Sequence, residues 1–141
     1  MKIESKKTIL EFDKNSRESF EFLGRKLKEN EQNPSNVDLF IYAMAYGFLN
    51  GNKVDSVQRS GTGPRTQYLK PEHELLMCAI QLSETGRVES LLNQEERYDL
   101  AERYAEGGIR LIKSAADQPG DFIQDLTAQM VHMYSQLKQG D

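Results

Sequence analysis

Cysteine is nearly absent from this chain of 141 residues, and histidine occurs only twice. The single cysteine, Cys78, excludes an internal disulfide and argues against a cysteine-based metal site. It lies in the apolar run LLMCAI, which is typical of a small buried hydrophobic residue. His73 begins a sequence like that of a zinc-protease helix, but Met77 stands where the second histidine ligand is required. We therefore expect no metal and no cofactor.

Long hydrophobic runs are also missing. The longest apolar stretch, residues 37–49, has 13 residues with one charge, Asp38. A helix of that length measures about 20 Å, which is shorter than the roughly 30 Å hydrocarbon core of a bilayer. The first 16 residues are charged and lack the apolar core of a signal peptide. The sequence predicts no membrane segment, and the cytoplasm is the expected location.

The net charge of −4 gives no general attraction for nucleic acid, but the charge is unevenly distributed. Residues 1–70 hold 12 basic and 9 acidic side chains, whereas residues 71–141 hold 6 and 13. A basic half joined to an acidic half can indicate a polar binding surface at one end. Ordinary scatter of surface charge explains the same numbers equally well.

Residues 37–49 are apolar on nearly every side, so a helix there must be covered by protein on most of its surface. Ser35 precedes it as a helix N-cap, with Asp38 three residues later, and Asn50-Gly51 provides the stop. We expect this stretch to be the central buried helix of a single domain spanning residues 1–141.

Apolar periodicity predicts the surrounding helices. They are expected at residues 16–29, 71–86, 94–116 and 121–139, with a short helical turn at 88–92. In the second of these the residues expected to face the core are Leu75, Leu76, Ala79, Ile80 and Leu82. The sequence thus predicts a mainly α fold, a bundle of about five helices around the buried helix.

Gly107-Gly108 lies inside a predicted helix, where each glycine costs roughly 1 kcal/mol relative to alanine. Either another helix passes close to the backbone there or the helix kinks, and we expect close packing.

At the N-terminus, Thr8, Leu10 and Phe12 alternate with their neighbours, which predicts a short strand.

The longest irregular stretch, residues 52–70, is expected to be a flexible basic loop. Its core, residues 60–66, lacks the Gly-Lys-Ser/Thr ending of a phosphate-binding P-loop. Cationic side chains in the loop and the N-terminus could contact nucleic-acid phosphates or an acidic partner, or simply be solvated. These candidate binding residues are Lys53, Arg59, Arg65, Lys70, Lys6 and Lys7. No catalytic set of residues stands out, so a non-enzymatic protein is expected.

Three segments together resemble a known family. They carry, in order, Phe40-x-x-Ala43-x-Ala45-x-Gly47-Phe48-x-x-Gly51, then Leu76-x-x-Ala79-Ile80-x-Leu82-x-Glu84-Thr85-Gly86, then Glu102-x-Tyr104-Ala105-x-Gly107-Gly108-Ile109-x-Leu111-Ile112. This order and spacing is similar to that of the dnd system-associated protein 4 family, whose genes lie beside bacterial DNA phosphorothioation genes. The resemblance covers roughly residues 30–115.

The resemblance implies an accessory subunit of an antiviral, restriction-modification type of defence. Such a protein would work through contact with protein subunits of the defence complex and, as a second route, through DNA binding. It brings no catalytic motif. The apolar stripe of residues 121–139 would serve self-association into a homo-oligomer as well as it would serve a core.

The alternative prediction comes from the order strand, helix, helix in residues 6–51, which is typical of a ribbon-helix-helix repressor or antitoxin. Such proteins pair their strands in a dimer and place alternate strand residues against the DNA bases. Here either Lys7, Ile9 and Glu11 or Lys6, Thr8 and Leu10 would face the bases. Apolar and acidic side chains are poor partners for bases and phosphates, which counts against this alternative.

Overall fold

The computed structural model describes residues 7–29, 33–116, 128 and 132. Its elements are α1 (Arg17–Glu29), α2 (Asn36–Leu49), η1 (Thr66–Tyr68), α3 (Pro71–Thr85), η2 (Val88–Leu92) and α4 (Gln94–Ala116), where η marks a 3-10 helix. The predicted mainly α fold is confirmed, with four α-helices in the described part of the chain. Apart from residues 128 and 132, which are helical, the predicted helix at 121–139 lies outside the described residues.

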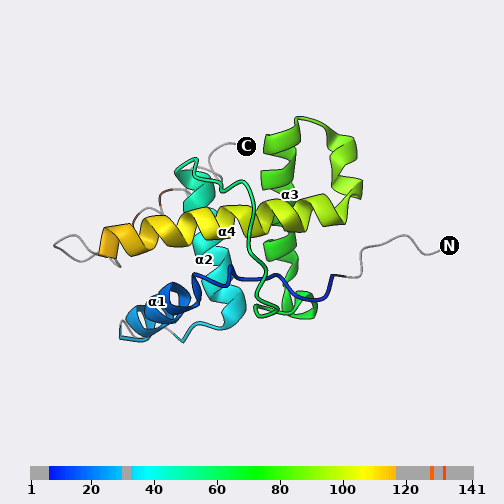
Figure 1. Cartoon of the computed structure of the whole chain (residues 1–141). Coiled ribbons are helices and arrows are strands. Elements are labelled where there is room, and N and C mark those ends of the chain that lie inside the picture. Colours follow the sequence, from blue (N-terminus) through cyan, green and yellow to red (C-terminus); the bar gives the residue numbers. More distant parts are fainter. Residues whose placement is uncertain (1–6, 30–32, 117–127, 129–131, 133–141) are drawn as a thin grey trace.

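The long helix α4 lies across α2, with α1 near one end of α4 and α3 near the other (Figure 1). The crossing is close because Gly47 of α2 and Gly108 of α4 meet there. A Cβ built on Gly47 would overlap the carbonyl oxygen of Tyr104, and one on Gly108 would overlap that of Ala43. α4 runs without interruption through Gly107-Gly108, so the prediction of close packing is confirmed.

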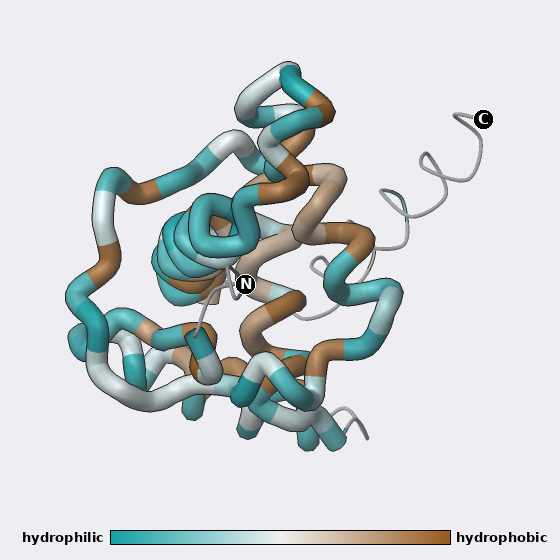
Figure 2. The backbone as a smooth tube through the Cα atoms, turned by 90° about the vertical axis from the view of Figure 1, so that its right-hand side faces the viewer, coloured by the Kyte–Doolittle hydropathy of each residue, from teal (hydrophilic) through white to brown (hydrophobic). Residues whose placement is uncertain are grey.

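The core lies around this crossing, and α2 is its centre. Phe40, Ala43 and Met44 are completely buried, which confirms the prediction of a central buried helix. From the N-terminal side Phe12 and Phe20 stack with ring centroids 4.1 Å apart. Figure 2 shows hydrophobic backbone stretches toward the middle of the molecule and hydrophilic stretches along its outer turns. None of the helices in the described residues is long and apolar enough to cross a bilayer.

The predicted inward face of α3 is partly wrong. Ile80 is buried as expected, but Leu75 is 71% and Leu82 is 37% exposed, and Ala79 is exposed as well. The helix instead turns Gln81 inward, where its amide donates to the carbonyl oxygens of η2 and of the residue that follows it. These hydrogen bonds hold α3 in a rotation that leaves an apolar stripe facing outward.

At the N-terminus, isolated β-bridges take the place of the predicted strand. Leu10 and Phe12 do point into the core, as their alternation predicts. However, among the described residues only isolated antiparallel bridges form, Ile9 with Arg65 and Asp13 with Arg59. The partner segment contains Gly61 and Gly63 with positive φ, and these bends prevent a continuous ladder.

Candidate functional site

The N-terminal segment and the basic loop, expected as two separate contact surfaces, lie side by side. The segment runs antiparallel to residues 58–66. Leu10 N–H donates to the Pro64 carbonyl and Phe12 N–H to the Thr62 carbonyl, each at 2.9 Å. The loop expected to be flexible is therefore attached to the body of the protein along much of its length.

A buried carboxylate beneath this pairing engages two of the predicted binding residues. Glu102 of α4 is 1% exposed and accepts the Glu11 N–H at 2.7 Å. Lys7 Nζ lies 3.0 Å from one of its carboxylate oxygens, and Arg59 Nη2 lies 3.2 Å from the other. Burial raises the pKa of Glu102, and the Glu11 N–H and the two cations oppose that rise. Lys7 and Arg59 thus hold the segment and the loop to α4.

Lys53 is engaged in the same way at the other end of the loop. Its ammonium forms an ion pair with Glu84 of α3 and lies 5.8 Å from the ring centroid of Tyr104. The Tyr104 hydroxyl donates to the same carboxylate at 2.8 Å. The hydrogen bond from Lys53 is the main reason that the pKa of Glu84 is lowered. Lys53 therefore connects the loop to α3 and α4.

Arg65 and Lys70 differ from these three cations. Both are exposed, and neither side chain forms an ion pair with a carboxylate in the described part of the chain. The Lys70 backbone N–H donates to Nδ1 of His73 at 3.0 Å, which closes the N-terminus of α3. Lys6 lies outside the described residues. Of the five predicted binding residues that the structure describes, Arg65 and Lys70 are the two without a carboxylate partner among the described residues.

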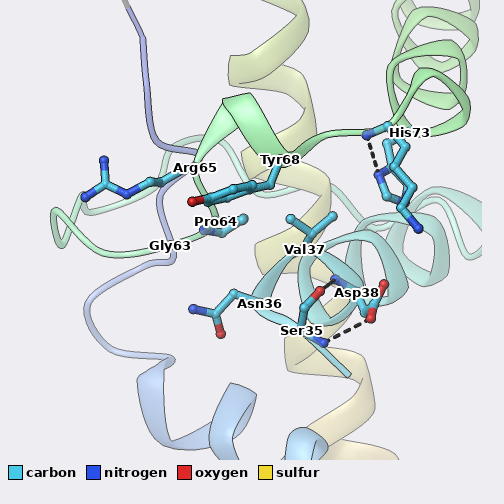
Figure 3. Close-up of a pocket in the computed structure, with 10 residues that line it drawn as sticks. Ser35, Asn36, Val37, Asp38, Gly63, Pro64, Arg65, Tyr68 and His73 are labelled. Atoms are coloured by element: carbon cyan, nitrogen blue, oxygen red, sulfur yellow. Dashed lines mark hydrogen bonds between the residues drawn. The ribbon is translucent and has the colours of Figure 1, made fainter. Parts of the chain in front are cut away.

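These two residues border a cavity of about 490 Å³ between the start of α2 and residues 63–73 (Figure 3). Its lining residues are Ser35, Asn36, Val37, Asp38, Gly63, Pro64, Arg65, Tyr68, Lys70 and His73. Pro64 and Val37 are buried and give the cavity an apolar floor. Tyr68 is 62% exposed, and in Figure 3 its ring lies across the middle of the cavity, above both of them.

The opposite wall is the first turn of α2. The hydroxyl of Ser35 accepts the Asp38 N–H, and the Asp38 carboxylate accepts the Ser35 N–H, so the predicted cap is confirmed. Asn36 is exposed and, in Figure 3, its side-chain amide points to the left of the view, as the Arg65 side chain does. The cavity therefore combines cations, an aromatic ring, an amide and an apolar floor.

Sequence reasoning identified the cations of this site but missed Tyr68 and the contribution from α2. Tyr68 falls between Arg65 and Lys70 in the chain, and a basic stretch interleaved with an aromatic residue is a pattern that could have indicated it. No local signal could have indicated Asn36, because it is brought to the loop only by the fold.

The ribbon-helix-helix alternative is not favoured by this arrangement. It requires the N-terminal segment to pair with a second copy of the chain, but the N–H groups of Leu10 and Phe12 already donate to the protein's own loop. Their side chains are buried and cannot reach a DNA groove.

Among the residues that the structure describes, no group of three or more histidine, cysteine, aspartate or glutamate side chains is arranged to hold a metal ion. Comparison with known proteins found no family model, no curated protein and no solved structure that matches this chain.

Proposed function

We propose that this protein is a non-enzymatic accessory subunit of a bacterial, phosphorothioation-linked DNA defence system, that it works in the cytoplasm, and that it acts by binding a partner subunit. The resemblance of its three helical segments to the dnd system-associated proteins supports the choice of system. The observation that carries the mode of action is the outward-facing apolar stripe on α3.

This stripe is built from one face of the helix. Leu75, Ala79 and Leu82 follow one another at spacings of four and three residues, and all three are exposed. The following connection adds Val88 and Leu92, which are 68% and 91% exposed. In Figure 2 this connection forms the top of the molecule and includes brown, hydrophobic stretches. Exposed apolar side chains grouped in this way mark interaction surfaces in soluble proteins.

The charges near the stripe suggest what the partner offers. Glu72 lies on the same face of α3, and Glu89 and Glu95 are exposed in and after η2. The partner surface should therefore present apolar side chains with basic residues around them, because opposite charges steer association and exclude wrong partners. An apolar helix with a basic border fits both requirements.

The test uses the proteins encoded next to this gene, each purified and titrated against this protein by isothermal calorimetry. Leu75→Gln should weaken the complex at least about tenfold, as expected for an exposed anchor residue. Leu49→Gln removes an equally apolar side chain, 37% exposed, at the end of α2 and should leave binding unchanged.

Three results would count against the proposal. One is a gene that stands far from any phosphorothioation or restriction gene. Another is equal binding by the Leu75→Gln and Leu49→Gln variants. The third is a metal ion that co-purifies with the protein in native mass spectrometry, which would indicate an enzyme.

A further inference from the structure

We propose that the cavity between the start of α2 and residues 63–73 binds one unpaired nucleotide, with its base against Tyr68 and its phosphate at Arg65 or Lys70. This inference comes from the cavity itself and does not depend on the partner or the defence system proposed above. The nucleotide could be free or belong to a single strand, and the chemistry of recognition is the same.

Two of the loop's cations are available to bind a phosphate. Lys7, Lys53 and Arg59 are held by carboxylates of the protein, so binding a phosphate would cost each of them an internal ion pair. Arg65 and Lys70 have no such competitor among the residues that the structure describes. They border the same cavity, one before and one after Tyr68 in the chain, and Figure 3 shows the Arg65 guanidinium extending outward from the loop. A phosphate beside either of them would meet positive charge without breaking an ion pair that the structure describes.

The exposed ring of Tyr68 offers a stacking surface for a base. Tyr68 keeps 62% of its surface exposed although Pro64 and Val37 supply an apolar floor beneath it. Because bases of every kind have a flat face, an exposed ring between two cations is the arrangement that single-strand binding proteins use for stacking. A cavity of about 490 Å³ is within the usual range for sites that hold small organic ligands.

The polar wall decides between ligand classes. The Asn36 side chain offers both a donor and an acceptor, which suits the edge of a base. Asp38 places a negative charge in the lining, so a phosphate is favoured beside the cations and a neutral base beside Asp38. An acidic peptide would use the two cations but would bring carboxylates toward Asp38 and gain little from Asn36. The arrangement therefore favours a nucleotide over a peptide.

The experiment measures fluorescence anisotropy of labelled ten-residue oligothymidylate with the full chain, at several salt concentrations. We expect a dissociation constant on the order of micromolar, which is within the range of sequence-independent binding. Tyr68→Ala should weaken it by about fivefold or more, whereas Tyr68→Phe keeps the ring and should bind like the original protein. Arg65→Gln and Lys70→Gln should each weaken binding and reduce the slope of log K against log salt by about 0.7.

Arg87→Gln is the matched control for charge. Arg87 is exposed after the far end of α3, away from the cavity, and removing it changes the net charge by the same amount. It should leave affinity for the oligonucleotide nearly unchanged. Circular dichroism of every variant confirms that the helical fold is retained.

Competing ligands show whether the site binds free nucleotides or single strands, and they include the results that would overturn the proposal. Thymidine monophosphate binding as tightly as the strand would support the site and assign it to free nucleotides, whereas much weaker binding would assign it to single strands. The proposal is overturned if a duplex binds as well as the strand and Tyr68→Ala has no effect, because that pattern is purely electrostatic. It is also overturned if a ten-residue polyglutamate peptide competes equally, or if no binding occurs at millimolar concentration.

Discussion

Replacing Gly108 by alanine tests how closely α2 and α4 approach. A Cβ at this position would lie 2.7 Å from the Ala43 carbonyl carbon and 2.8 Å from the Gly47 nitrogen, and closer still to the Ala43 oxygen. All three are backbone atoms of α2, so no side chain can rotate to make room. Either α2 moves away from α4 or the added methyl group is compressed.

The two energetic effects of this change oppose each other. Alanine is a better helix former than glycine by roughly 1 kcal/mol. Overpacking a core typically costs about 1–3 kcal/mol, and a collision with backbone belongs at the upper end. We therefore expect Gly108→Ala to lower the free energy of unfolding by about 2 kcal/mol, a large fraction of the stability of a typical domain.

Gly24 provides the matched control within the same protein. It also lies inside a helix, α1, but a Cβ there would meet only the Leu39 side chain, at 3.5 Å, which is an ordinary contact. Gly24→Ala should therefore raise the free energy of unfolding by about 0.5–1 kcal/mol, through helix propensity alone. The same chemical change is predicted to have opposite signs at the two sites.

Urea denaturation followed by circular dichroism measures both variants. With a denaturant slope of about 2 kcal/mol per molar, Gly108→Ala should lower the unfolding midpoint by about 1 M. Gly24→Ala should raise it by a few tenths of a molar. The reasoning is refuted if Gly108→Ala unfolds at or above the midpoint of the original protein, because the helices would then have room that the structure does not give them.

Two further predictions concern buried polar groups. Burial raises the pKa of Glu106, which is 2% exposed, against the hydrogen bonds from Ser16 and Arg110. The folded protein therefore binds a proton on the Glu106 carboxylate more tightly than the unfolded chain does. The free energy of unfolding should rise as the pH falls from 7 toward 4.5, the ordinary pKa of a glutamate, and Glu106→Gln should flatten that rise in urea titrations at each pH. An unchanged dependence of stability on pH in the variant would contradict the assignment. Gln81→Leu removes the donor to two backbone carbonyls and the acceptor for Arg97. Leaving those buried groups unpaired should lower the free energy of unfolding by about 2–4 kcal/mol in the same assay. A loss below about 1 kcal/mol would show that water replaces the amide.

Where a local pattern controls the structure, sequence reasoning succeeded. The cap of α2 by Ser35 and its end at Asn50-Gly51 depend on neighbours within a few positions, and the apolar run in between supplies the buried Phe40, Ala43 and Met44. The pair Gly107-Gly108 was informative for another reason, because its cost in a helix requires compensation by close packing.

The rotation of α3 could not be read from its own residues. Leu75 and Leu82 are as apolar as the buried Ile80, so periodicity alone placed them in the core. The carbonyls of η2 and of Asn93 bond to Gln81 and determine which face turns inward, and that connection is visible only in the folded chain.

The sequence by itself determined that this protein is helical, that residues 37–49 are its centre, and that its basic side chains are grouped in the first 70 residues. Tertiary structure alone decided which of those cations are available. Lys7, Lys53 and Arg59 each have a carboxylate partner at least four and as many as 95 positions away, whereas Arg65 and Lys70 border an open cavity. The physical reason is that charge is a property of each residue, whereas its neutralisation depends on which distant segments the fold brings within a few ångströms.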